Sequence, residues 1–255
     1  MSAYISYSEL KDWKQCSYYH KLTRVDGLAG FTGNEYTAFG TAMHSVCDRK
    51  MLNEQFDHDE YFLSEFEKNL SELDDESEIK PKLIEQMRIA GGNIIPHIMP
   101  AVEEKFGKNY EVISTEEKLM VPIDGTNFNF KGYVDLVIKT EDGKYHVIDW
   151  KTCSWGWDMR KRSDPMVTYQ LTFYKKFFAI KHGIDPSDIE THFALLKRTA
   201  KKNFVEFVDV SSGSRKTNNA MELLMMAIKN IAAKKVIKNK LSCKRCSFYK
   251  TKHCP

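Results

Sequence analysis

Two acidic residues and a lysine in the middle of the chain have a spacing that suits metal-assisted chemistry. If this part folds as a hairpin that is symmetric about Asp142, then Asp135 and Asp149 face each other, because each lies seven residues from the turn. Directly opposed carboxylates lie about 5 Å apart and repel each other unless a cation lies between them. Lys151 follows Asp149 by two residues and therefore projects from the same face of the strand.

These three side chains carry the groups that phosphodiester hydrolysis requires. Carboxylate oxygens bind Mg²⁺ or Mn²⁺, the ion activates water, and an ammonium group orients that water or offsets the developing charge. The alternative is an ordinary strand with a surface salt bridge, because the spacing D-x13-D-x-K also occurs by chance. We interpret the three residues as a candidate hydrolytic site.

Three cysteines near the C-terminus, Cys243, Cys246 and Cys254, form a second group that could do chemistry. In a reducing compartment, clustered cysteines are expected to be metal ligands or redox-active thiols rather than disulfides. A four-ligand site needs one more residue, and the spacing alone leaves several candidates open. These candidates are Cys16, Cys47, Cys153 and His253.

The composition predicts one large domain that is soluble and cytoplasmic. The chain has 255 residues, of which 42% are hydrophobic, and this is enough for one core that carries an inserted lobe. No stretch approaches the roughly 20 apolar residues of a membrane span, and the N-terminus lacks the features of a signal peptide. We therefore expect no membrane association.

Charge is distributed unevenly along the chain, although the net charge is only +3. Residues 57–78 contain ten acids and one lysine, and they belong to a segment, 52–109, whose helical pattern is interrupted by prolines and glycines. We interpret this segment as an inserted helical lobe. The 33 residues after Glu222 contain nine Lys or Arg and no acid, which favours nucleic acid as a partner. The alternative is a solvated basic helix and tail.

Strands must position the hairpin residues, and the alternation of apolar and polar residues predicts five of them. They span residues 110–123, 128–140, 144–152, 191–199 and 203–210. We expect the first three to be antiparallel, with Glu141–Gly143 as the turn between the second and the third.

Helices are predicted near both ends of the chain and before the fourth strand. Ser6 and Glu9 fit a capping box that starts an N-terminal helix, so Cys16 lies on this helix or just after it. A capping aspartate, a first-position proline and a final glycine predict a helix over residues 165–182. A last helix is predicted over residues 216–238.

Four segments of the sequence resemble those of a known family. "GYVDLVI" (132–138) and "HVIDWKT" (146–152) resemble the core of the PD-(D/E)xK nucleases, and "GTAMHSV" (40–46) and "YQLTFYK" (169–175) resemble their RecB-type exonuclease branch. The resemblance implies an α/β (α+β) fold with a restriction-endonuclease-like core, in which helices flank a central mixed β-sheet. It also implies a single nuclease domain, 1–255, into which the helical lobe is inserted.

The resemblance assigns a role to each hairpin residue. Asp135 matches the first acidic metal ligand of the family, Asp149 the second, and Lys151 the catalytic lysine. The backbone carbonyl of Trp150 would complete the coordination. His44 matches a metal-ligating histidine of the branch, and a neutral imidazole would favour Mn²⁺.

Further residues match less central positions of the family. Gln170 and Tyr174 match a Q-x3-Y helix motif, and their spacing places both on one face of the helix. An acidic residue on the first core strand of some relatives could correspond to Glu116 or Glu117, of which we favour Glu117.

A segment near the N-terminus, "WKQCSYYHKLTRV", resembles the one that carries the first cysteine in cluster-bearing members of this branch, such as AddB-type and CRISPR-associated nucleases. This likeness implies that four cysteines hold a [4Fe-4S] cluster that joins residues 1–25 to residues 240–255. The implied ligands are Cys16, Cys243, Cys246 and Cys254. Zn²⁺ in a four-cysteine site is the alternative.

Taken with the resemblance, the sequence predicts a metal-dependent DNA exonuclease that acts on single strands or duplex ends in recombination, repair or phage DNA metabolism. Lys197 and Arg198, at a strand end, would bind phosphates. No Walker motif is present, so a helicase or recombination partner would be a separate chain, and some relatives form homo-oligomers. The alternatives are a catalytically silent DNA-binding subunit and a zinc-stapled nucleic-acid-binding protein.

Overall fold

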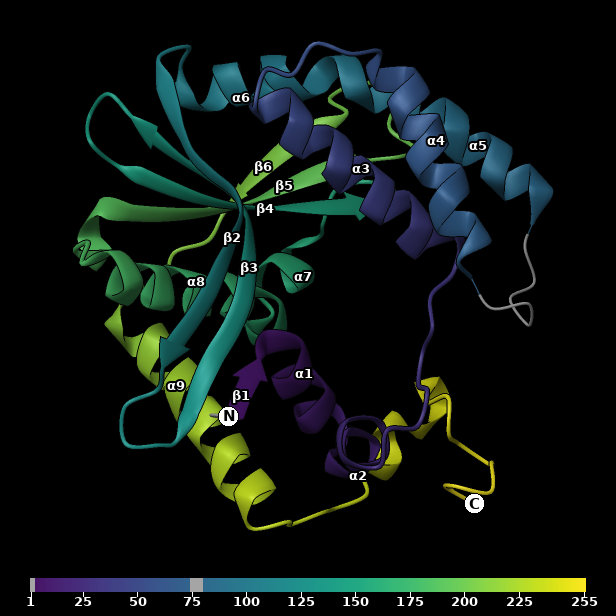
Figure 1. The fold of residues 1–255 in the computed structure, drawn as a ribbon, viewed down its shortest axis with the longest axis vertical. Helices are drawn as coiled ribbons and strands as arrows, with labels where there is room; N and C mark the ends of the chain where they lie inside the picture. The colour runs from purple at the N-terminus through teal and green to yellow at the C-terminus, as the bar shows by residue number, and fades with distance from the viewer. Residues whose placement is uncertain (1–2, 74–79) are drawn as a thin grey trace.

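A mixed β-sheet forms the centre of the protein (Figure 1), which we describe from a computed structural model covering residues 3–73 and 80–255. The strands lie in the order β1-β3-β4-β5-β6, and β2 pairs with β3. β1–β3 and β4–β5 are parallel, whereas β2–β3, β3–β4 and β5–β6 are antiparallel. The strands are β1 (Ala3–Ser6), β2 (Tyr110–Pro122), β3 (Phe128–Thr140), β4 (Tyr145–Cys153), β5 (Ile189–Lys197) and β6 (Val205–Asp209).

Helices lie on both faces of the sheet and connect its strands. The α-helices are α1 (Tyr7–Gln15), α2 (Ser17–His20), α3 (Glu35–Met51), α4 (His58–Ser71), α5 (Pro81–Ile94), α6 (Ile98–Phe106), α7 (Met159–Ser163), α8 (Pro165–His182) and α9 (Ser214–Ala232). A π-helical turn (Lys21–Val25) follows α2, and short 3-10 turns span Ile95–His97, Pro186–Asp188 and Lys240–Arg245. No helix in the described ranges is both long enough and apolar enough to cross a membrane.

Two apolar clusters, one on each face, hold the helices to the sheet. Alternation along β3 and β4 sends Val137 and Val147 into the cluster with α8 and α9, and Leu136 and Ile148 into the cluster with α3 to α6. Figure 1 shows these two helical layers on opposite sides of the strands. The predicted mixed sheet flanked by helices is therefore confirmed.

The register of the β3–β4 hairpin is the one predicted from its symmetry. The paired residues run from Lys139–Tyr145 to Leu136–Ile148, and all of these pairs are symmetric about Asp142. Gly143 has a left-handed backbone (φ 83°), which a glycine adopts without steric cost, and it lets the chain reverse within the predicted turn.

Two segments that were expected to be helical, 216–238 and 52–109, have different helix bounds in the structure. The last helix ends at Ala232 rather than at residue 238, because half of the residues 233–238 are lysines and the apolar Val236 and Ile237 among them are exposed rather than packed. Helices α4 to α6 occupy the described part of the predicted lobe 52–109, of which residues 74–79 lie outside the described ranges. That this segment is an insertion stays a prediction.

Candidate active site

The hairpin strands separate at the point where their acidic residues lie. β3 and β4 are paired only up to Leu136–Ile148, and beyond this pair they diverge, as Figure 1 shows. Asp135 therefore does not pair directly with Asp149; its Oδ2 accepts a hydrogen bond of 2.8 Å from the backbone N–H of Trp150. We call the region between the separated strands the gap; side chains from both helical layers fill it, Gln170 from α8 and His44 from α3.

Asp149 lies in this gap and is almost completely buried, with 1% of the residue exposed. Its Oδ1 accepts a hydrogen bond of 2.8 Å from Gln170 Nε2 on α8, and its Oδ2 pairs with the Lys151 ammonium group. Gln170 Nε2 also lies 3.2 Å from the hydroxyl of Tyr174, one turn further along α8. The structure thus brings two of the predicted residues, Lys151 and Gln170, into contact with the Asp149 carboxylate, and Tyr174 into contact with Gln170.

The acids and the lysine shift the pKa values of one another. Burial raises the pKa of Asp135 to about 6 against the lowering effect of the nearby Lys151 charge. Burial likewise raises the pKa of Asp149 to about 6, and repulsion from Asp135 adds to this effect. Burial opposes charge on Lys151, but the two carboxylates raise its pKa, so the ammonium group stays protonated.

His44 enters the gap from the opposite face, on α3, which packs against β2, β3 and β4. Its Nδ1 lies 3.5 Å from Asp135 Oδ2. Burial lowers the pKa of His44 to about 4, and the positive charge of Lys151 contributes to this shift. The imidazole is therefore neutral near pH 7 and has a lone pair to offer to a metal ion.

Glu117, the favoured acid of the first core strand, lies elsewhere. Its Oε1 accepts hydrogen bonds from Lys181 Nζ (2.5 Å) and pairs with His182 Nε2 (2.8 Å) at the end of α8. Glu117 is thus paired at the end of α8, whereas the charge of Glu116 acts on Asp135, so Glu116 is the better candidate for this acid.

Glu116 lies in β2 between the pairs Thr115–Leu136 and Glu117–Val134, and this places it opposite Asp135. Its backbone is left-handed (φ 50°), a conformation that is uncommon for a residue other than glycine and that marks a local distortion of the strand. The Glu116 charge contributes to the raised pKa of Asp135.

Asp48 is a residue of the site that the sequence analysis did not single out. It lies one helical turn after His44 on α3, and burial, with help from the charges of Asp135 and Glu116, raises its pKa to about 8. Among the described residues, its buried Oδ1 has no hydrogen-bond partner. The spacing of four from His44 was the signal that could have identified it.

The two basic residues proposed for phosphate binding differ in how accessible their charged groups are to a phosphate. Lys197 Nζ pairs with Glu206 Oε2 on the neighbouring strand at 3.1 Å, and only 12% of its side chain is exposed. Arg198 lies at the edge, where its guanidinium group stacks over the ring of Tyr36 at 4.7 Å and hydrogen bonds to Ser154. Arg198 is thus better placed than Lys197 to contact a phosphate.

The four cysteines of the predicted cluster line one cavity of about 200 Å³ between the two ends of the chain. Hydrogen bonds join these ends: Ser17 Oγ donates to the Ile237 carbonyl at 3.0 Å, and the Tyr18 hydroxyl donates to the His253 carbonyl at 2.9 Å. Cys47 lies instead on α3, where it is buried in the core, and Cys153 lies on β4. All six cysteines are free.

The cysteine sulfurs are spread around this cavity. We searched residues 3–73 and 80–255 for groups of three His, Cys, Asp or Glu residues whose ligand atoms all lie within 4.8 Å of one another. The group found consists of His146, Glu190 and His192. Neither the cavity cysteines nor His44 with the two hairpin acids meet this criterion. At the hairpin, Lys151 supplies the positive charge that Asp149 contacts.

Comparison with known proteins agrees with this combination of sheet, acids and lysine. Residues 4–251 match the PD-(D/E)XK nuclease superfamily, so the chain belongs to that superfamily. The protein is therefore a nuclease by family.

A solved structure has a similar fold. A crystal structure of a protein from Eubacterium rectale, provisionally described as an exonuclease, has a TM-score of 0.61 and 15% sequence identity, and the match covers 93% of this chain and 84% of that one. The structure of SSO0001 has a TM-score of 0.39 and 15% identity over 83% of this chain and 94% of that one, and it supports no conclusion. No curated protein matches the sequence.

Proposed function

We propose that the protein is a metal-dependent DNA exonuclease of the RecB-type branch. The observation that carries this proposal is the buried contact of Asp149 with Lys151 and Gln170, next to Asp135 and His44, in the gap between β3 and β4. The similarity in fold to a protein described as an exonuclease supports the mode of cleavage. The basic C-terminal part supports DNA as the substrate.

The residues of the gap fit a divalent metal ion. Two carboxylates with raised pKa values, a neutral imidazole and a buried oxygen of Asp48 without a hydrogen-bond partner leave the gap short of positive charge. Asp135, Asp149, His44 and the carbonyl of Trp150 would hold Mn²⁺ or Mg²⁺, and the imidazole favours Mn²⁺. When bound, the ion would lower the pKa of a water molecule and stabilise charge on the phosphate.

The side chains of the chain itself would then orient the reactants. Lys151 Nζ carries three N–H donors, and it would hold the attacking water by its oxygen and offset negative charge that develops on the phosphate. Gln170 fixes the Asp149 carboxylate, because its amide donates to Oδ1 while its helix is anchored in the core. Tyr174 in turn holds Gln170, since the two groups share a hydrogen bond on one face of α8.

The cavity lined by Cys16, Cys243, Cys246 and Cys254 would hold a [4Fe-4S] cluster. A single zinc ion with bonds of about 2.3 Å to four sulfurs requires them to lie about 3.8 Å apart. Among the described residues no three of these sulfurs lie within 4.8 Å of one another, so the sulfurs would have to move closer together to hold a single zinc ion. The cluster would tie residues 1–25 to residues 240–255.

The cellular setting also belongs to the proposal. A role in recombination, repair or phage DNA metabolism, a helicase or recombination partner, a homo-oligomer and a cytoplasmic location stay predictions from the sequence and its resemblance. The single nuclease domain with the lobe 52–109 inserted in it also stays a prediction. Six free cysteines are compatible with a reducing compartment.

The test is digestion of single-stranded DNA that is labelled at one end or the other, beside a circular DNA of the same sequence, in Mn²⁺ and in Mg²⁺. We expect metal-dependent loss of the linear DNA and survival of the circle. Cleavage of the circle would show an endonuclease instead. Binding of both DNAs without cleavage, in protein that retains its iron, would support the catalytically silent DNA-binding subunit.

A further inference from the structure

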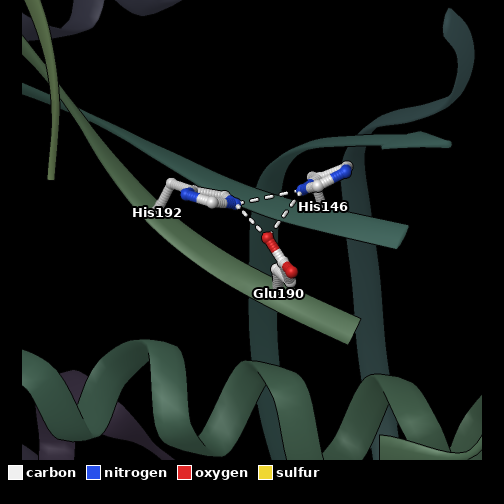
Figure 2. A group of neighbouring side chains, drawn as sticks. All are labelled: His146, Glu190 and His192. Atoms are coloured by element: carbon white, nitrogen blue, oxygen red, sulfur yellow. Dashed lines mark hydrogen bonds and ion pairs between the residues drawn. The ribbon is translucent and has the colours of Figure 1, made fainter. Parts of the chain in front are cut away.

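A second group of metal-ligating side chains lies at the start of β4 and β5, away from the proposed active site. His146 is on β4, and Glu190 and His192 are on β5 (Figure 2). The two strands are parallel and place His146 beside Glu190, and Glu190 and His192 share a face because they are two residues apart. This face is covered by α6, whereas Asp149 projects from the other face of β4 toward α8.

The distances among the three ligand atoms match the size of a zinc site. His146 Nδ1 lies 3.1 Å from His192 Nε2, and Glu190 Oε2 lies 3.7 Å from the first nitrogen and 4.0 Å from the second. The circle through three points with these separations has a radius of about 2.1 Å. Zinc keeps about 2.0–2.2 Å from imidazole nitrogen and carboxylate oxygen, so one ion fits between all three atoms.

Hydrogen bonds on the outer side of each ring fix which nitrogen carries the proton. His192 Nδ1 lies 2.8 Å from the Asp209 carboxylate, which can only accept, so Nδ1 carries the hydrogen and Nε2 keeps its lone pair. His146 Nε2 lies 3.0 Å from Thr140 Oγ1, whose own hydrogen goes to Asp142 Oδ1 at 2.6 Å. Nε2 of His146 is therefore the donor, and its Nδ1 keeps a lone pair.

Two lone pairs and a carboxylate thus point into the same space, and they repel one another unless a cation lies between them. A shared proton or a metal ion could be that cation. The surroundings disfavour a charged imidazolium, because His146 and His192 are only 7% and 2% exposed. The ring of Phe106 covers them, with centroids 4.8 and 5.2 Å away.

We propose that His146, Glu190 and His192 form a zinc-type divalent cation site that crosslinks the parallel strands β4 and β5. Two imidazoles and one carboxylate are a ligand set that zinc accepts, with a fourth position left for water. The side chain of Glu190 is 56% exposed, so the ion can enter from solvent. Asp209 and Thr140 orient the two rings from outside, as outer hydrogen-bond partners of metal-binding histidines do.

The test counts zinc ions bound by the purified full chain. Glu190→Gln removes one ligand at an exposed position and should leave the fold intact, and Glu104→Gln, an exposed glutamate on α6, is the matched control. After metal removal and titration with ZnCl₂, native mass spectrometry should show one zinc ion fewer in Glu190→Gln than in the wild type and Glu104→Gln. Zinc bound by cysteines is common to all three proteins and cancels in this comparison.

A second variant tests the outer partner. Asp209→Asn should weaken zinc binding by about 10- to 100-fold, measured in competition with a chromophoric chelator, because the amide orients the His192 ring less firmly than the carboxylate does. An equal zinc count in the wild type and in Glu190→Gln would overturn the proposal and leave a shared proton as the cation.

Discussion

At the scale of single residues, the proposed active site is an arrangement of buried charges that depend on one another. Asp149 is 1% exposed, and Lys151 and Gln170 are the groups that contact its carboxylate. A buried carboxylate that loses its partner is costly, because the remaining charge is neither hydrated nor compensated. The lysine therefore serves the fold of this gap as well as the chemistry proposed for it.

Replacing the lysine should separate these two contributions. We expect Lys151→Met to lower the single-turnover rate of DNA cleavage at least about 100-fold, because the water loses the group that orients it. The pKa of Asp149 should rise further, since the ammonium group now lowers it. Lys139→Met, a lysine near the hairpin turn whose ammonium lies over the Tyr145 ring, is the control and should cleave at close to the wild-type rate. A Lys151→Met protein that is folded and fully active would contradict this role.

The sequence singles out most residues of the proposed site. It does not show in which direction the side chains of Glu116, Glu117 and Lys197 project. The hairpin acids and the lysine were singled out from strand symmetry and alternation, which are local properties, whereas Gln170 and Tyr174 of α8 came from the resemblance to the family. Glu116 could not be separated from Glu117, because the left-handed backbone of Glu116 depends on tertiary packing that the sequence does not reveal. The pairing of Lys197 with Glu206 likewise required the register between β5 and β6.

At the scale of elements, the helices of the predicted lobe are fixed by aromatic packing. Phe62 and Phe66 of α4 pack against Phe39 of α3, with ring centroids 5.6 and 5.9 Å away. Gly91 of α5 lies directly against this group, since a Cβ atom at that position would be 2.2 Å from a ring carbon of Phe62. At the neighbouring Gly92, a Cβ atom would lie in open space.

Replacing either of these adjacent glycines by alanine should change the free energy of unfolding, but in opposite directions. Gly91→Ala should lower the free energy of unfolding by about 1–3 kcal/mol, because the methyl group has no room beside Phe62. Gly92→Ala should raise it by about 0.5–1 kcal/mol, because alanine favours a helix and here meets nothing. Denaturant unfolding of both variants measures the difference, and equal stabilities would show that α5 does not pack on α4 as described.

The sequence predicts the ends of a helix correctly where capping residues mark them. The helix over 165–182 agrees with α8, because Asp164 caps its first turn and Gly183 ends it in a left-handed conformation. α9 ends six residues before the predicted end, because Val236 and Ile237 continue the apolar pattern in the sequence although their side chains are exposed in the structure.

At the scale of the whole molecule, the two ends of the chain meet beside the helix that positions the active site. Segments around α2 and around residues 237–254 are hydrogen bonded to each other, and they enclose the cavity of the four cysteines. α1, directly before this cavity, packs against α8, and the Tyr7 hydroxyl donates to the Met166 carbonyl of that helix. A cluster in the cavity would therefore stabilise the helix that carries Gln170.

Removal of one cavity cysteine tests this connection. Cys16→Ala should lose iron and acid-labile sulfide together and unfold at a lower temperature, because the N-terminal segment is no longer tied to the C-terminal one. Cys153→Ser, which removes a cysteine outside the cavity, should keep its iron. A full iron complement in Cys16→Ala would exclude Cys16 as a ligand.

The central claim is that the gap between β3 and β4 is the active site, and one rate comparison tests it most directly. Asp149→Asn keeps the shape of the side chain but removes its charge, whereas Asp124→Asn makes the same change at an exposed turn between β2 and β3. With end-labelled single-stranded DNA and Mn²⁺, we predict a single-turnover rate at least about 1,000-fold below wild type for Asp149→Asn and close to wild type for Asp124→Asn. Cleavage by folded Asp149→Asn at the wild-type rate would contradict the account.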